Sequence, residues 1–128
     1  MCDKLRVLIV DDNRDALFLL QRFVGKSDCN IRLCNESAAA VRIAQEFAPH
    51  VIFLDIAMPV LDGFEVAEDL HDVDLGEYLL VALTSYDDEA HRRECEATGF
   101  HLFLAKPPAL EEVARVIEMA KDRFLTSA

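Results

Sequence analysis

The chain has 128 residues, 52% of them hydrophobic, and a formal net charge of -11. This length and composition suit a single domain over residues 1–128 with a core of its own. The negative charge argues against direct binding to nucleic acid or to an anionic membrane. No apolar run approaches the roughly 18 residues that cross a bilayer, and no signal peptide is recognisable, so we expect a cytoplasmic protein. The four cysteines form no C-x-x-C pair, and we expect free thiols.

Apolar runs that suit buried strands alternate with helical patterns along the chain. In chain order, we predict a strand at 5–10, a helix at 15–24, a strand at 30–34, a helix at 37–47, a strand at 51–54, a helix at 64–70, a strand at 79–83, a helix at 88–97, a strand at 101–105 and a helix at 110–124. Gly25 and Pro49 should end the first two helices. Five strand–helix units predict an α/β fold with one parallel sheet covered by helices on both faces.

Acidic residues follow two of the predicted strands. Asp11 and Asp12 come directly after the first strand, and Asp55 ends the third. In such folds ligands bind at the carboxyl ends of the strands, where these three carboxylates would meet if the two strands are neighbours. Because they repel one another, the cluster calls for a cation, and the absence of Cys or His favours Mg²⁺. Taken singly, each acid has an ordinary alternative: Asp11 and Asp12 can cap the next helix, and Asp55 can simply end a buried strand.

Two further strand ends carry polar groups. Thr84 follows the fourth predicted strand, and Lys106 follows the fifth. Either residue alone is ordinary, because strands often end on a hydroxyl and lysines commonly reach the surface. Together with the three acids, they place an alcohol and an ammonium group at the same edge of the sheet. This combination is far more specific than any of its members.

The chain resembles a response-regulator receiver domain of two-component signalling over about residues 5–124. The resemblance rests on five short motifs: Val10-Asp11-Asp12, Leu54-Asp55-Ile56-Ala57-Met58-Pro59, Asp62-Gly63, Leu83-Thr84-Ser85 and Lys106-Pro107. It implies a flavodoxin-like, doubly wound (βα)5 fold with a five-stranded parallel sheet in the order 2-1-3-4-5. It also implies a cis peptide bond between Lys106 and Pro107 and a tight turn at Gly63.

The resemblance assigns a role to each residue at the edge of the sheet. Asp55 would be the phosphoacceptor, which attacks a phosphoryl group carried by a histidine of the partner. Asp12 and Asp55 would bind Mg²⁺ (or Mn²⁺) directly, Asp11 would bind it mainly through water, and Ala57 would contribute its backbone carbonyl. In this scheme Asp55 and its neighbours form an aspartyl phosphate without being a turnover enzyme.

Lys106 would pair with Asp55 at rest and with a phosphoryl oxygen afterwards, and Thr84 would donate a hydrogen bond to another phosphoryl oxygen. Thr84 and Phe103 would form the switch that changes the face of the fourth helix, fifth strand and fifth helix. The helix at 88–97 has few apolar residues, so we expect it to shift most easily. Phe103 has an equally good alternative as a core residue.

Two positions beside the acceptor are expected to tune the loss of phosphate. Ala57 lies two residues after Asp55, and Tyr86 lies two after Thr84. Alanine cannot hold an attacking water and tyrosine can shield the phosphoryl group, so we expect slow self-hydrolysis. Ala57 also argues against the rival interpretation as an aspartate-nucleophile phosphatase, because those enzymes need a second acid at this position.

The expected phosphodonor is a sensor histidine kinase or a histidine phosphotransfer protein, and the downstream protein target stays unknown. We expect no direct contact with nucleic acid or membrane, and a monomer or weak homodimer. A second rival is a degenerate receiver that works without phosphate, but such proteins normally lack a site residue and none is missing here. The sequence leaves open whether the domain stands alone or belongs to a hybrid kinase or larger regulator.

Overall fold

Five hydrophobic runs form one parallel sheet in the computed structural model, which describes residues 4–58, 62–84, 93–94 and 96–125. The strands are β1 (Leu5–Val10), β2 (Cys29–Cys34), β3 (Val51–Asp55), β4 (Leu79–Thr84) and β5 (Leu102–Ala105). Their order is β2-β1-β3-β4-β5, as the resemblance implied. Every residue of β3 and β4 is buried, which explains why these strands read as continuous apolar runs rather than alternating patterns.

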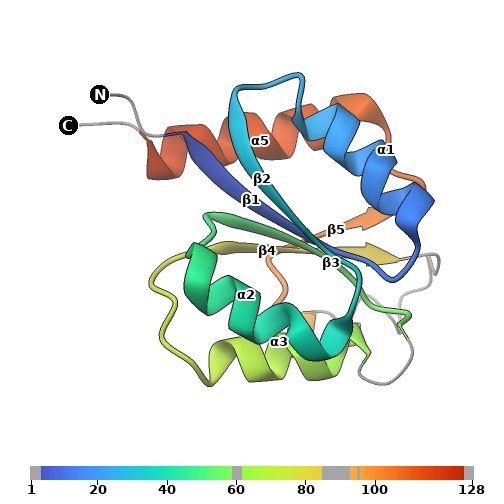
Figure 1. Ribbon diagram of the computed structural model, residues 1–128, viewed down its shortest axis with the longest axis vertical. Coiled ribbons are helices and arrows are strands. Elements are labelled where there is room, and N and C mark those ends of the chain that lie inside the picture. Colours follow the sequence, from blue (N-terminus) through green and yellow to red (C-terminus); the bar gives the residue numbers. More distant parts are fainter. Residues whose placement is uncertain (1–3, 59–61, 85–92, 95, 126–128) are drawn as a thin grey trace.

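Helices cover both faces of the sheet, as the alternation of elements predicted. Figure 1 shows α1 and α5 on one face and α2 and α3 on the other. The helical elements are α1 (Arg14–Val24), a 3-10 turn η1 (Ser37–Ala39), α2 (Ala40–Phe47), α3 (Gly63–His71) and α5 (Leu110–Phe124). Among the described ranges, no helix has the length and apolar character required to cross a bilayer.

The described elements agree with the predicted boundaries to within one residue, and two of the differences have a visible cause. The helix predicted at 37–47 opens as a 3-10 turn, because no side chain caps its first turn and the Ala40 N–H bonds to the Ser37 carbonyl instead. The last strand begins at 102 rather than 101, because His101 uses its side chain as well as its backbone to contact β4. The helix predicted at 88–97 lies largely outside the described residues, although 93, 94, 96 and 97 are helical.

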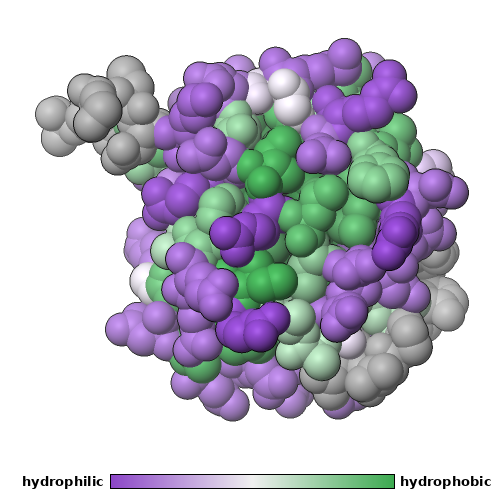
Figure 2. All heavy atoms as spheres, in the orientation of Figure 1, coloured by the Kyte–Doolittle hydropathy of each residue, from purple (hydrophilic) through white to green (hydrophobic). Residues whose placement is uncertain are grey.

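The sheet divides the interior into two apolar layers. Side chains under α1 and α5 form one layer, and those under α2 and α3 form the other. The predicted inward face of α5 is confirmed: Val113, Val116, Ile117 and Ala120 are all buried. Along the free edge of the sheet, Ile31 and Leu33 of β2 are only partly buried. Figure 2, which has the orientation of Figure 1, shows hydrophobic atoms across the middle of the molecular face in view.

Charged and sulfur-containing side chains complete the β2 edge. Arg32 lies over the Phe47 ring, 5.3 Å from its centroid, and 3.9 Å from Glu46. A charge on an edge strand discourages pairing with another chain. Cys29 and Cys34 are free thiols, as expected, while Cys2 and Cys95 lie outside the described residues.

Candidate functional site

Three carboxylates meet at the carboxyl ends of β1 and β3. The two strands are paired, with Val10 opposite Leu54, so Asp11, Asp12 and Asp55 emerge side by side. One oxygen from each of the three carboxylates lies within 4.8 Å of the others. Asp11 and Asp55 are 1% and 2% exposed, whereas Asp12 is open to solvent. The predicted convergence of the three acids is therefore present in the fold.

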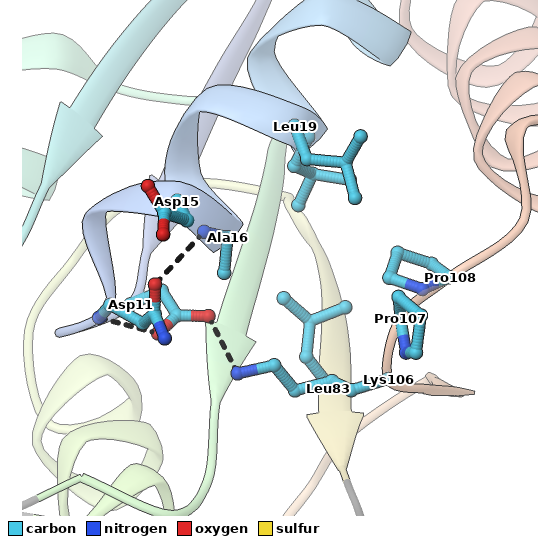
Figure 3. Close-up of a pocket in the computed structure, with 10 residues that line it drawn as sticks. Asp11, Asp15, Ala16, Leu19, Leu83, Lys106, Pro107 and Pro108 are labelled. Atoms are coloured by element: carbon cyan, nitrogen blue, oxygen red, sulfur yellow. Dashed lines mark hydrogen bonds and ion pairs between the residues drawn. The ribbon is translucent and has the colours of Figure 1, made fainter.

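Lys106 reaches into this cluster from the end of β5. Its Nζ lies 2.9 Å from Asp11 Oδ2 and 3.4 Å from Asp55 Oδ2. Figure 3 shows the lysine side chain extending from the β5 end toward Asp11. The resemblance paired Lys106 with Asp55, but the structure gives it both partners and places it nearer to Asp11. The Lys106–Pro107 peptide bond is cis, and the Lys106 N–H donates to the Thr84 carbonyl over 2.8 Å.

Backbone N–H groups fix the two buried carboxylates. Asp11 Oδ1 accepts a hydrogen bond of 2.9 Å from the Asn13 N–H, and Asp55 Oδ1 accepts one of 3.1 Å from the Ala57 N–H. With one oxygen held in this way, the other oxygen of each carboxylate faces Lys106. The sequence indicated a helix cap within residues 12–15, and Asn13 is that cap, because its Oδ1 accepts a hydrogen bond from the Ala16 N–H. Its contact with Asp11 was not predicted.

Electrostatics at the site favour a cation. Burial raises the pKa of Asp55 to about 6, and the neighbouring charge of Asp11 adds to this effect. The Ala57 N–H and Lys106 act in the opposite direction. Burial alone would disfavour the charged form of Lys106, but its contacts with Asp11 and Asp55 raise its pKa. Lys106 contacts two of the three carboxylates, so its single ammonium group leaves negative charge in the cluster uncompensated.

The donor set suits a hard divalent cation. It consists of carboxylate oxygens, with no imidazole or thiolate in the group. Oxygen-only sites with few carboxylates suit Mg²⁺, which keeps several waters in its shell. Asp12 is exposed and Asp11 and Asp55 are fixed by the backbone, so the residues present fit such an ion.

A close approach of backbone to backbone shapes the loop after β3. A Cβ on Gly63 would lie 2.4 Å from Ile56 Cα and 2.6 Å from the Asp55 carbonyl oxygen, so only glycine fits here. The Gly63 N–H donates to the Ile56 carbonyl over 3.0 Å. Asp62 caps α3 through a 2.9 Å bond from the Glu65 N–H to its Oδ1. The first turn of α3 is thereby held directly against the end of β3.

The remaining predicted site residues are distributed around this centre. Thr84 is the last residue of β4 and is buried, and it pairs with Ala105 across the sheet. Phe103 lies in the middle of β5 and is half-buried against the layer under α2 and α3. Ala57 is exposed beside Asp55. Tyr86 lies outside the described residues.

A cavity of about 450 Å³ opens beside the carboxylates, which the sequence did not predict. One wall comes from the start of α1, with Asp15, Ala16 and Leu19, and the opposite wall from Pro107 and Pro108 (Figure 3). Leu83 of β4 and Lys106 lie between these walls, and Asp11 of the acid cluster lines the cavity as well (Figure 3). The cavity therefore has mostly apolar walls and borders the charged groups of Asp11 and Lys106.

Comparison with known proteins identifies the family. A family model described as "Response regulator receiver domain" matches residues 7–118. The chain belongs to the response regulator receiver family. Phosphorylation of an aspartate and binding of Mg²⁺ are general properties of this family, whose members act as signalling switches in two-component systems.

Curated relatives of this receiver include larger regulators. It is 39% identical to the transcriptional regulatory protein PrrA of Mycobacterium leprae over 125 residues, which are 95% of this chain and 52% of PrrA. It is 33% identical to the response regulator MprA of the same organism, covering 85% of this chain and 47% of MprA. The receiver therefore spans about half the length of these relatives.

Solved structures support the same assignment. The receiver domain of Ssk1 from Saccharomyces cerevisiae, crystallised with the histidine phosphotransfer protein Ypd1, matches with a TM-score of 0.87 and 27% identity, covering 98% of this chain and 94% of that chain. The chemotaxis protein CheY4 of Vibrio cholerae matches with a TM-score of 0.84 and 22% identity, covering 92% and 99%. The second likeness concerns the fold alone.

Proposed function

We propose that this receiver accepts a phosphoryl group on Asp55 from the histidine of a sensor kinase or phosphotransfer protein. The observation that carries the proposal is the position of Asp55: a nearly fully buried carboxylate at a strand end, 3.4 Å from Lys106 and next to two further acids. Membership of the family supports the general chemistry, and the assignment to these particular residues is our inference.

In the proposed transfer, an Asp55 oxygen attacks phosphorus. A new O–P bond forms while the P–N bond breaks, and the bonding pair leaves with the imidazole nitrogen, which takes up a proton. The Ala57 N–H bond to Oδ1 orients the carboxylate, so Oδ2, the oxygen that faces Lys106, is the natural nucleophile. Lys106 would then pair with a phosphoryl oxygen, and Thr84 would donate to another.

Asp12, Asp55 and the Ala57 backbone carbonyl would hold Mg²⁺ directly, and Asp11 would hold it mainly through water. When bound, the ion would draw negative charge from the phosphoryl oxygens and allow one anion to approach another. Asp12 is the exposed member of the three, so it gives an entering ion its first contact. Mn²⁺ has the same preference for oxygen and is expected to substitute.

The donor protein would dock on the cavity next to Asp11 and Lys106. Leu19 and Pro108 line this cavity, and Phe18 and Leu19 on α1 are 54% and 36% exposed. Exposed apolar groups of this size beside a charged centre are typical of a protein-binding surface. The similar receiver domain of Ssk1 was crystallised with a histidine phosphotransfer protein, which supports a donor of this kind.

Thr84 and Phe103 would transmit the change to the face formed by the fourth helix, β5 and α5. Phe103 lies on β5 opposite Ala82 of β4, and it lines a small cavity of about 150 Å³ together with Glu112, Arg115 and Met119 of α5. A rearrangement of Phe103 would alter this cavity. With Ala57 and Tyr86 beside the acceptor, we expect hydrolysis of the aspartyl phosphate to be slow, and a lifetime of seconds would contradict this part.

Incubation with acetyl phosphate and Mg²⁺, followed by intact mass measurement, tests the proposal. We expect the mass of one phosphoryl group to be added to the wild-type chain and to be absent in Asp55→Asn. Asp69→Asn, which makes the same change of charge at an exposed position of α3, should be phosphorylated like the wild type. Phosphate on Asp55→Asn, or none on the wild type with any donor and metal, would reject the assignment.

A further inference from the structure

Two histidines occupy equivalent places at the amino-terminal edge of the sheet, opposite the acid cluster. His50 directly precedes β3 and His101 directly precedes β5. The His101 N–H donates to the Leu80 carbonyl over 2.9 Å, and His101 Nδ1 accepts from the Leu80 N–H over 2.9 Å. His50 makes the same pair of bonds with Arg6, at 2.8 and 2.9 Å. Each imidazole thus extends the strand ladder by one bond.

The bond to Leu80 fixes the protonation state of His101. A backbone N–H can only donate, so Nδ1 must carry a lone pair and the proton of the neutral ring must lie on Nε2. An imidazolium has protons on both nitrogens. Protonation would therefore replace the bond with two opposed N–H groups, at the point where β5 first joins β4.

The surroundings of His101 also disfavour a positive charge. It lines a shallow cavity of about 240 Å³ with His71, Glu77, Tyr78 and Arg123. Burial, and then the charges of Arg123 on α5 and His71 on α3, lower the pKa of His101. Glu77 is the one carboxylate among these lining residues, and it lies 3.9 Å from Arg123. The negative charge of Glu77, which would favour a protonated His101, is therefore already partly neutralised by Arg123.

His71 lines the same cavity but is built to tolerate protonation. Its Nε2 lies 3.1 Å from the Thr98 carbonyl, which can only accept, so Nε2 carries a proton. Its Nδ1 lies 3.0 Å from the Tyr78 hydroxyl. A hydroxyl can donate or accept, so it can reverse its role when Nδ1 gains a proton. His71 keeps both hydrogen bonds in either state, and His101 does not.

We propose that His101 is an acid-sensitive clasp between β4 and β5, which releases the amino-terminal end of β5 when its ring is protonated. Phe103 lies two residues further along the strand, and Lys106 follows its far end. If the proposed function holds, acidification would loosen the strand that carries the proposed switch residue. The release of the clasp itself does not depend on phosphorylation.

The test is an NMR titration of the whole chain, unphosphorylated and in EDTA, from about pH 8 to about pH 5. We expect the His101 ring to titrate with a midpoint below 6.5, the ordinary value for histidine. The Leu80 amide should shift with the same midpoint. Its hydrogen-exchange protection factor should fall by up to about tenfold per pH unit as the pH drops from 6.5 to that midpoint, and it should level off below the midpoint. The proposal would be overturned if the chemical shift of the Leu80 amide did not change as His101 titrates. It would also be overturned if the His101 midpoint were at or above 6.5.

Two variants separate the clasp from a merely structural histidine. His101→Asn places an amide oxygen near the position of Nδ1, so it should keep the Leu80 bond and lose the pH dependence of Leu80 protection. His71→Gln alters the same cavity and should keep that dependence, with its midpoint moved slightly upward because a nearby positive charge is removed. An unchanged pH response in His101→Asn would refute the clasp, and the wild-type titration decides the matter if this variant does not fold. Because no phosphodonor or metal is present, these results are independent of whether Asp55 accepts phosphate.

Discussion

Replacement of Asp55 by Asn should stabilise the metal-free protein at neutral pH, although it removes the proposed acceptor. The carboxyl group is 2% exposed, and burial raises its pKa from 3.8 to about 6. A raised pKa means that the folded state holds the proton more tightly than the unfolded state. Stability is therefore highest while the group is protonated, and it is lost as the pH rises from about 4 through about 6.

The size of the effect follows from the shift. The pKa rises by about two units, each worth about 1.36 kcal/mol, so ionisation of Asp55 costs up to about 3 kcal/mol. Asparagine has a similar shape and does not ionise. We expect Asp55→Asn to be more stable than the wild type by up to about 3 kcal/mol at about pH 7.5, and most of this difference should vanish near pH 4.

Urea unfolding in EDTA at both pH values, followed by far-ultraviolet circular dichroism, measures the difference. Asp69→Asn, at an exposed position, controls for the change in net charge. Added Mg²⁺ should stabilise the wild type and leave Asp55→Asn almost unaffected, because the variant lacks one carboxylate of the cluster. Equal stabilities at about pH 7.5, or a less stable Asp55→Asn in EDTA, would refute the reasoning.

Three further predictions concern the loop, the lysine and the core. Gly63→Ala should lower the free energy of unfolding by about 1–3 kcal/mol and slow phosphorylation, because the added Cβ would overlap backbone atoms. The control is Gly76→Ala, where φ is 73° and the space around the residue is open. It should lower the free energy of unfolding by about 1 kcal/mol and leave phosphorylation intact. Equal phosphorylation rates in the two variants would contradict this. Lys106→Met should bind Mg²⁺ more tightly in isothermal titration, because the ammonium competes for the same carboxylates, and unchanged or weaker binding would argue against that competition. Ile117 is 1% exposed, and Ile117→Ala should lower the free energy of unfolding in urea by about 2–5 kcal/mol. Met119 is 45% exposed, and Met119→Ala should lower it by at most about 0.5 kcal/mol. Similar losses in both would mean that this face of α5 is not the buried one.

The strands and the polar residues at their ends could be predicted from the sequence for a simple reason. Strands buried on both faces are uninterrupted apolar runs, and the chain must turn polar where they end. Asp11, Asp55 and Thr84 each stand at such a point. The order of the strands came from the resemblance instead, because no local pattern says which strands are neighbours.

The contacts that escaped prediction depend on register and on side-chain geometry. The bonds of His50 and His101 join residues 44 and 21 positions apart, and they exist only once the strands are aligned. The division of Lys106 between Asp11 and Asp55 likewise depends on where its long side chain ends. Asn13 fixes Asp11 through a backbone N–H, a group that every residue type except proline supplies.

The division of the interior by the sheet has a consequence for how this chain tolerates mutation. Leu8 and Ile9 are consecutive in β1, yet they belong to opposite layers. Side chains on opposite faces share few partners, so their energetic effects should sum rather than reinforce one another. A destabilising substitution in the layer beneath α2 can then be offset by a stabilising substitution in the layer beneath α5. During evolution the two layers can therefore accumulate substitutions largely independently, although they belong to one small domain.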